Sequence, residues 1–229
     1  MKKYKLAAIV AALTLAISTF TTPSMAVNIG IGISGAYTDL ETDGTETLKT
    51  SSAQQSTSVD TVVNIPSIFI QLEMNGWVLG IDHIPGEAEL GATKTTRGDQ
   101  LKGTAEAAPN VDQIVQAEIS DHNTYYIETP GFGFGDGNGL YLMAGYTEFD
   151  VATNETLGTG AAYPDASIDG TTLGIGVKQT FDNGIFVKAI ATHTDYDDIS
   201  LASTGSDASS TIDASIESTA AKFALGYNF

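Results

Sequence analysis

The feature of this chain that most constrains its fold is a two-residue alternation of large apolar with small or polar side chains. Ile29, Ile31 and Ile33 alternate with glycine and serine, and the same pattern returns over 171–181 and 216–229. A period of two is that of a β-strand, because successive side chains point to opposite faces, whereas a helix repeats every three or four residues. The alternation therefore predicts an all-β fold.

The small face of these strands indicates which way the sheet is turned. It carries Gly and Ser rather than the Lys and Glu that are usual on a solvated sheet face. A soluble sandwich buries its large side chains between two sheets, whereas a membrane barrel points them at lipid and lines its lumen with small and polar ones. We therefore expect Ile31, Ile175 and Leu225 to face hydrocarbon.

Hairpin signals set the number of strands. Asn75-Gly76, Asn138-Gly139 and Asn183-Gly184 each lie between alternating runs, and Asn-Gly favours a type I′ turn, which needs positive φ at both central residues. Each dipeptide is thus predicted to join two strands tightly, which gives an eight-stranded antiparallel up-and-down transmembrane β-barrel. The expected strands are 28–38, 65–73, 77–84, 120–130, 140–149, 171–181, 185–194 and 216–229.

The other connections are predicted to be long polar loops, over 39–60, 85–118, 150–169 and 195–214. Tight turns that alternate with long loops are typical of an outer-membrane barrel, whose short turns are periplasmic and whose long loops are extracellular. An even number of strands would place both ends of the barrel on the periplasmic side. Within this pattern Pro66 is expected at a bulge or above the membrane, and Asp121 and Asn123 interrupt the apolar face of their strand.

Aromatic residues near the predicted strand ends suggest two interfacial girdles, which membrane barrels carry at the two edges of their apolar band. The alternative is the general preference of aromatic residues for strands. The group near the tight turns is Trp77, Phe181, Phe186, Tyr227 and Phe229, and the group near the long loops is Tyr37, Tyr146, Phe149 and Tyr196.

The first residues predict export. Lys2, Lys3 and Lys5 precede an uncharged, largely apolar run over 6–20, which Ser24-Met25-Ala26 follows as a small-x-small cleavage site. The alternative, a permanent anchor, would need roughly 20 apolar residues to span the bilayer. We therefore expect 1–26 to be a cleaved signal peptide and 27–229 to be the barrel domain.

Composition excludes several classes of protein. The sequence has no cysteine, so it can form neither a disulfide framework nor a thiolate metal site. Its net charge is −18, and removal of the leader lysines leaves −21, which argues against nucleic-acid binding. The acids gather in the predicted loops, for example at Asp195, Asp197 and Asp198. Divalent cations are one candidate partner of these acids, and diffuse solvated charge is the alternative.

A set of charged residues is predicted to point into the lumen. A lysine on the lipid face would cost roughly 2–4 kcal/mol at the midplane, which favours the inward placement of these side chains. Three acids and three lysines could pair and plug a barrel of this size, and a polar pore is the functional alternative. The predicted residues are Glu73, Asp82, Glu128, Lys178, Lys188 and Lys222.

The last residues carry a sharp motif, Phe223-Ala224-Leu225-Gly226-Tyr227-Asn228-Phe229. Its terminal Phe and alternate apolar positions resemble the β-signal read by the barrel-assembly machinery. With the segments 139–146 and 184–191, the mature chain resembles the small eight-stranded outer-membrane proteins: OmpX, the opacity proteins, the OmpA membrane domain and OmpW. The resemblance implies a place in the bacterial outer membrane among lipid and lipopolysaccharide, with Phe223, Leu225, Tyr227 and Phe229 as the assembly signal.

No pattern in the chain predicts catalysis or a cofactor. Gly30-Ile31-Gly32-Ile33-Ser34-Gly35 matches a nucleotide-binding fingerprint literally, but no helix is expected after it. His83, His122 and His193 lack the spacing of metal ligands. We therefore expect a non-enzymatic structural and surface-interaction barrel that displays acidic extracellular loops. The alternatives are a narrow porin-like channel for small or hydrophobic solutes, as the likeness to OmpW implies, and a lipid-modifying barrel enzyme.

Overall fold

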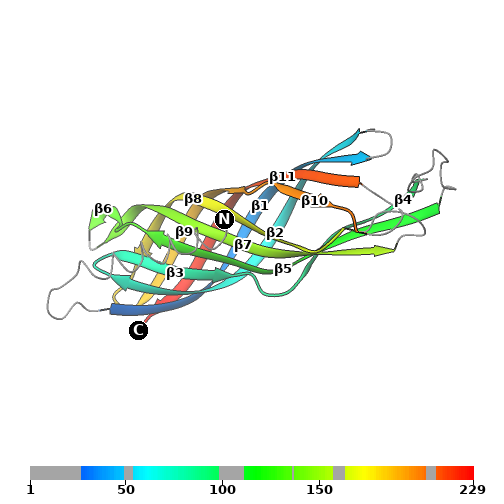
Figure 1. Ribbon diagram of the computed structural model, residues 1–229. Helices are drawn as coiled ribbons and strands as arrows, with labels where there is room; N and C mark the ends of the chain where they lie inside the picture. The colour runs from blue at the N-terminus through cyan, green and yellow to red at the C-terminus, as the bar shows by residue number, and fades with distance from the viewer. Residues whose placement is uncertain (1–26, 49–53, 98–110, 136, 157–162, 205–209) are drawn as a thin grey trace.

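The computed structural model describes residues 27–48, 54–97, 111–135, 137–156, 163–204 and 210–229, so the predicted leader lies outside the described residues. Within these ranges the chain is all-β (Figure 1). None of the described segments is a helix with the length and hydropathy needed to span a bilayer. The strands are β1 (Val27–Leu48), β2 (Gln54–Met74), β3 (Trp77–His83), β4 (Ala88–Arg97), β5 (Val111–Glu128), β6 (Phe132–Gly135), β7 (Asn138–Thr156), β8 (Ala166–Thr180), β9 (Ile185–Tyr196), β10 (Ile199–Ala202) and β11 (Ser210–Asn228).

Eight of these strands form a closed ring in the order β1, β2, β3, β5, β7, β8, β9 and β11. The ring closes where the first strand, β1, pairs with the last, β11. Three further pairings, β3–β5, β5–β7 and β9–β11, each pass over one strand of the chain that lies outside the ring. All neighbours are antiparallel, which confirms the predicted eight-stranded barrel. The strands β4, β6 and β10 lie outside the ring and pair with β5, β7 and β11.

Except for β3, the strands of the ring are longer than predicted, and much of the sequence expected as loop is paired strand. The β1–β2 register continues to Thr47↔Gln54, and β4 and β10 occupy parts of 85–118 and 195–214. Figure 1 shows the far ends of β1 and β2 projecting beyond the ring. The prediction missed these parts because both faces of the ladder are polar there, so the apolar alternation disappears although Thr and Val still favour strands.

The tight turns follow the Asn-Gly prediction in one case and depart from it in two. Asn75 and Gly76 have φ of 53° and 80°, as a type I′ turn requires. Gly184 has φ of 84° and donates its N–H to the Phe181 carbonyl at 2.9 Å, so this turn instead ends on a left-handed glycine. The prediction for Asn138-Gly139 was wrong, because both residues lie within β7 and pair with β6, which carries the turn further out.

Two predicted irregularities have different outcomes. Pro66 pairs with Gly35 in an unbroken register, so it is not at a bulge. It lies beyond Ile68, where pairing with β3 begins, and no strand among the described residues pairs there with the edge toward which its missing N–H would point. The second irregularity is a β-bulge in β5, where Asp121 has φ of 52° and the register shifts between Ser120 and Asn123.

Most of the large aliphatic side chains of the ring face outward, and a smaller set that includes Val78, Ile168 and Ile190 is buried inside. Ile31, Ile175 and Leu225 are 47%, 55% and 47% exposed, whereas Ser34 and Ser67 are buried and hydrogen-bonded to each other on the inner face. The predicted direction of the two faces is therefore that of the structure. The interior is narrow, and side chains from opposite parts of the ring meet across it.

Candidate functional site: the lumenal charge network

Lys188 on β9 is the centre of the lumenal network. Its side chain is 6% exposed, and its ammonium group donates to Glu128 Oε1 and Oε2 at 2.8 and 2.7 Å. It also donates to Gln71 Oε1 at 2.7 Å. An ammonium group removed from water is tolerated only when a counter-charge and further acceptors satisfy its donors. Residues from β2 and β5 supply these groups, so three strands are joined through one buried cation.

An aromatic cage surrounds the same ammonium group. The ring centroids of Phe69, Tyr126, Tyr141 and Phe186 lie 5.4–5.9 Å from Lys188 Nζ. At this distance the negative face of each ring attracts the cation, and the effect is larger when the group is desolvated. The rings and the Glu128 carboxylate together hold the charge in place inside the barrel.

Inward-facing glycines make room for the cage. A Cβ added to Gly32 would overlap the ring of Phe69, and one added to Gly80 would overlap that of Tyr126. In the same way, Gly176 lies under Tyr141 and Gly226 under Phe186. The sequence showed that glycines line the lumen, but it did not show that each leaves space for a ring from a neighbouring strand.

Three aromatic residues expected in the interfacial girdles are instead inside the barrel. Phe186, Phe149 and Tyr196 are 2%, 4% and 9% exposed. The prediction assigned them from their place along the strands, whereas the inward or outward direction depends on parity and register. Trp77 and Tyr37 do face outward, at 42% and 59% exposure.

The remaining predicted charges are all on the lumen side, but they form one further ion pair rather than two. Lys222 Nζ lies 3.1 Å from Asp82 Oδ1. Lys178 Nζ donates to the Gly76 carbonyl at 3.1 Å and lies 5.8 Å from the Tyr141 ring, without a carboxylate partner among the described residues. Glu73, half-buried, accepts from Asn228 Nδ2 at 3.4 Å.

A belt of threonine hydroxyls runs across four neighbouring strands of the inner wall. The Oγ1 atoms of Thr124 and Thr147 are 3.0 Å apart, those of Thr147 and Thr172 are 2.8 Å apart, and those of Thr172 and Thr194 are 2.8 Å apart. The sequence analysis missed this belt, although all four residues lie on the small and polar face of their strands. A threonine ladder of this kind stabilises strand pairing from within.

An apolar cluster fills the lumen beyond the threonine belt. Phe149, Ile168 and Tyr196 are buried together, with Phe149 and Tyr196 in edge-to-face contact at 5.3 Å. Residues around them are Ile119, Val151, Ile199 and Ile216. Charged, hydroxyl and apolar layers thus follow one another along the interior, and each is occupied by side chains.

A row of carboxylates crosses the outer face of four neighbouring strands, β2, β1, β11 and β9, near the ends that project beyond the ring. Glu41 is the register partner of both Asp60 and Glu217, and Glu217 is in turn the partner of Asp195. Acids directly opposite one another across a ladder repel. Close to this row, a side-chain interaction with the Asp60 carboxyl raises the pKa of Asp39 above its ordinary value, because the neighbouring carboxyl group favours the protonated form.

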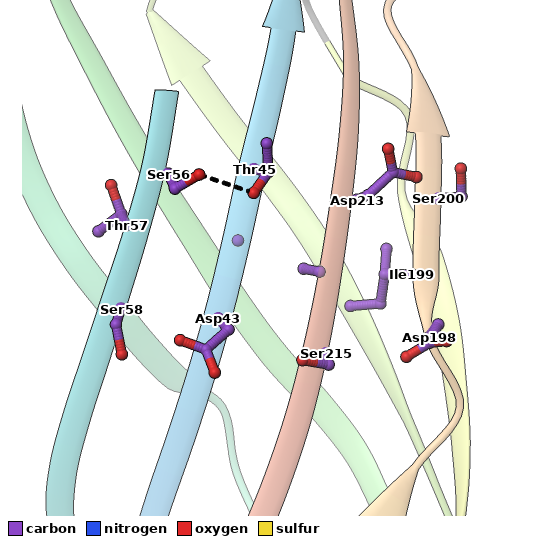
Figure 2. Close-up of a pocket in the computed structure, with 12 residues that line it drawn as sticks. Asp43, Thr45, Ser56, Thr57, Ser58, Asp198, Ile199, Ser200, Asp213 and Ser215 are labelled. Atoms are coloured by element: carbon purple, nitrogen blue, oxygen red, sulfur yellow. Dashed lines mark hydrogen bonds between the residues drawn. The ribbon is translucent and has the colours of Figure 1, made fainter. Parts of the chain in front are cut away.

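A shallow hollow of about 750 Å³ lies over the same projecting strands (Figure 2). Asp43, Asp198 and Asp213 line it together with serine and threonine residues, and Thr45 Oγ1 lies 3.0 Å from Ser56 Oγ. Across the described ranges, no three acidic or histidine side chains are grouped closely enough to hold a metal ion. Figure 2 accordingly shows the three carboxylates spread over the hollow, with Asp43 on β1, Asp213 on β11 and Asp198 in the connection that precedes β10.

The predicted assembly signal lies at the end of β11 with its apolar side chains outside the ring. Phe223, Leu225 and Tyr227 are exposed, and Phe229 contacts the Tyr227 ring edge-to-face at 5.0 Å. The Phe229 N–H donates to the Ile29 carbonyl at 2.8 Å, which ties the last residue to the first strand. The residues predicted as this signal therefore lie where β11 and β1 close the barrel.

Comparison with solved structures identifies other barrels of this type. The outer membrane protease OmpT from Escherichia coli is 11% identical, with a TM-score of 0.50 over 91% of this chain and 100% of that one. Neisserial surface protein A is 9% identical, with a TM-score of 0.40 over 89% and 99%. A Pseudomonas aeruginosa FadL homologue is 8% identical, with a TM-score of 0.36 over 88% and 90%.

No family model matches the sequence, and no match was found among curated proteins. The likeness to OmpT is one of fold, because the two sequences share few residues. Together with the closed ring of eight antiparallel strands, it supports an antiparallel β-barrel fold for this chain.

Proposed function

We propose that this chain is an exported, non-enzymatic barrel of the bacterial outer membrane, with a structural and surface-interaction role. One observation carries the proposal: most strands of the ring present exposed large apolar side chains to the surroundings, which together form a band. A water-soluble barrel would lose stability by leaving such a band in water, since apolar area in water costs roughly 25 cal/mol per Å². The band consists of Ile29, Ile31, Ile33, Ile68, Ile70, Leu72, Ile81, Leu140, Leu142, Leu173, Ile175, Val177, Ile185, Phe223 and Leu225.

The height of the band supports a membrane span. On β1 the outward residues are apolar from Ile29 to Tyr37, and the next outward residue is Asp39. Nine residues match the 9–11 that a tilted transmembrane strand needs. Trp77 and Tyr227 lie near one edge of the band and Tyr37 near the other, where interfacial aromatic residues are favoured. The acidic projecting strands would then stand in the extracellular medium.

The filled interior favours a structural role over transport. The caged Lys188, the Asp82–Lys222 ion pair and the apolar cluster around Phe149 occupy successive levels of the lumen. An eight-stranded barrel has room for little beyond its own side chains. The lumenal charges would therefore hold the ring together from within rather than guide a solute.

The proposal is tested by expressing the full chain in a Gram-negative host and isolating outer-membrane fractions. We expect the protein there, with residue 27 at its N-terminus, and a gel mobility that changes only after boiling. A protein found in the soluble periplasmic fraction would contradict the membrane assignment. Planar-bilayer recording on the same sample distinguishes the alternative: we expect no single-channel steps, and reproducible steps would indicate a narrow channel instead.

A further inference from the structure

The second strand has a long edge without a neighbour. β2 pairs with β1 along its whole length, but with β3 only from Ile68 to Met74. Beyond that point β3 ends, and β4 pairs with β5 instead. Among the described strands, none pairs with the other edge of residues 54–67. The projecting half of β2 is thus a half-paired strand.

The direction of its free backbone groups follows from the adjacent turn. Asn75-Gly76 is a two-residue turn, so Met74 and Trp77 exchange hydrogen bonds, and every second residue before Met74 points its N–H and C=O toward β3. The same series continues along the free edge. It contains Pro66, which has no N–H to leave unpaired, and then Asn64, Val62, Asp60, Ser58 and Ser56.

This edge lacks most of the features by which proteins protect exposed strands. Between 54 and 65 there is no lysine, arginine or proline, and Asp60 is the one charged residue. Valine and threonine favour the extended backbone, and Val59 and Val62 are 49% and 48% exposed. An open edge of this length is a template for a further strand, because its donors and acceptors are already aligned.

The negative charge beside the free edge of β2 indicates what kind of strand would bind there. Asp60 lies on the edge itself and is one end of the row of carboxylates, which continues on the same face through its register partner Glu41 to Glu217. A second copy would bring an identical acidic row beside the first, and each chain carries a net charge of −18. We propose that residues 54–65 bind an extended, lysine- or arginine-bearing segment of another protein by strand addition. The proposal rests on the proposed function only for placing this edge outside the cell.

The experiment uses the folded full chain in detergent and a fluorescent ten-residue peptide that alternates lysine with threonine. The test variant is Ser58→Pro/Val62→Pro, which removes two free-edge N–H groups but leaves the bonds to β1, as Pro66 does naturally. The matched control is Ser58→Ala/Val62→Ala, which keeps both N–H groups. We expect the proline variant to bind about 30-fold more weakly, given about 1 kcal/mol for each backbone hydrogen bond, and the alanine variant to bind within about twofold of the parent.

Three outcomes would overturn the proposal. The first is equal binding by the parent and a proline variant that still shows heat-modifiable mobility. The second comes from the parent protein with altered peptides. Either a lysine–threonine peptide N-methylated at alternate residues, or a glutamate–threonine peptide, would bind as tightly as the original lysine–threonine peptide. The third is concentration-dependent dimerisation of the parent without peptide binding, which would assign the edge to a second copy. In each case normal membrane fractionation would leave the proposed function intact.

Discussion

Lys188 Nζ and Glu128 Oε2 lie 2.7 Å apart inside the barrel, on strands that are not neighbours in the ring. Removing one partner leaves a buried charge without its counter-charge, which costs about 3–5 kcal/mol. We therefore expect Lys188→Met or Glu128→Gln to lower the urea midpoint of the heat-modifiable form clearly. The double variant Lys188→Met/Glu128→Leu should recover most of the loss, because it buries no charge. Single variants as stable as the parent would contradict a tightly coupled pair.

The glycines under the cage rings give a second prediction. In Gly80→Ala the new methyl group would overlap the Tyr126 ring, so the ring or the backbone must move. Overpacking of this kind costs about 1–3 kcal/mol. The control is Gly35→Ala, because a Cβ there meets no atom within 4 Å. Urea unfolding of both variants measures the difference, and equal midpoints would show that the cage rings are free to shift.

The lipid-facing band can be tested with a matched pair of lysine substitutions. Ile31 and Val62 are exposed to a similar degree, at 47% and 48%, but Ile31 lies within the band and Val62 beyond it. In Ile31→Lys the charge would enter hydrocarbon, at a cost of roughly 2–4 kcal/mol near the midplane. We expect Ile31→Lys to fold poorly into lipid vesicles and Val62→Lys to fold normally. Similar folding yields for the two would remove the basis of the membrane assignment.

The projecting strands should respond to pH through Asp39. The side-chain interaction with Asp60 raises the pKa of Asp39 above its ordinary value of 3.8, so Asp39 binds a proton more tightly in the folded state than in the unfolded state. This contribution to stability is present in full below the ordinary pKa and is lost as pH rises through the raised one. The backbone amides of residues 39–48 should therefore be better protected from hydrogen exchange in acid than at neutral pH. This comparison is made after correction for the intrinsic pH dependence of the exchange rate. Asp39→Asn should flatten the pH dependence, and Asp43→Asn should leave it unchanged.

The terminal residue should matter more for assembly than for stability. Phe229 is 70% exposed and joins β1 by one backbone hydrogen bond that any residue can donate. Phe229→Ser should therefore lower the amount of barrel assembled in cells while the purified, refolded variant unfolds at the urea midpoint of the parent. A variant that reaches the membrane in normal amounts would show that the last residue is not read as an assembly signal.

The apolar alternation was enough to predict the barrel. Few other folds have strands with large apolar side chains on one face and small or polar side chains on the other. It predicted Ile31, Ile175 and Leu225 on the outside, and they are there. It failed where both faces are polar, as in the far halves of β1 and β2, which were expected as loop. There the β-propensity of threonine and valine was the remaining signal, and it is weak.

The contacts of the lumen were harder to predict than its composition. Parity was enough to place Glu128 and Lys188 on the inner face, but their contact depends on ring closure and stagger between distant strands. For the same reason Phe186 was assigned to an interfacial girdle although its ring packs against Lys188. The glycine opposite it, Gly226, was the available signal, because a ring over an inward glycine needs that space.

The threonine belt has a property that the ion pairs lack. Each hydroxyl can rotate, so the chain from Thr124 to Thr194 can donate in either direction around the wall with the same number of bonds. Reversing it turns a row of dipoles without moving a heavy atom. The hydroxyl dipoles of the inner wall can thus turn toward neighbouring charges such as Asp82 and Lys222. In this way an interior with fixed heavy atoms keeps some of the dielectric response that water would provide.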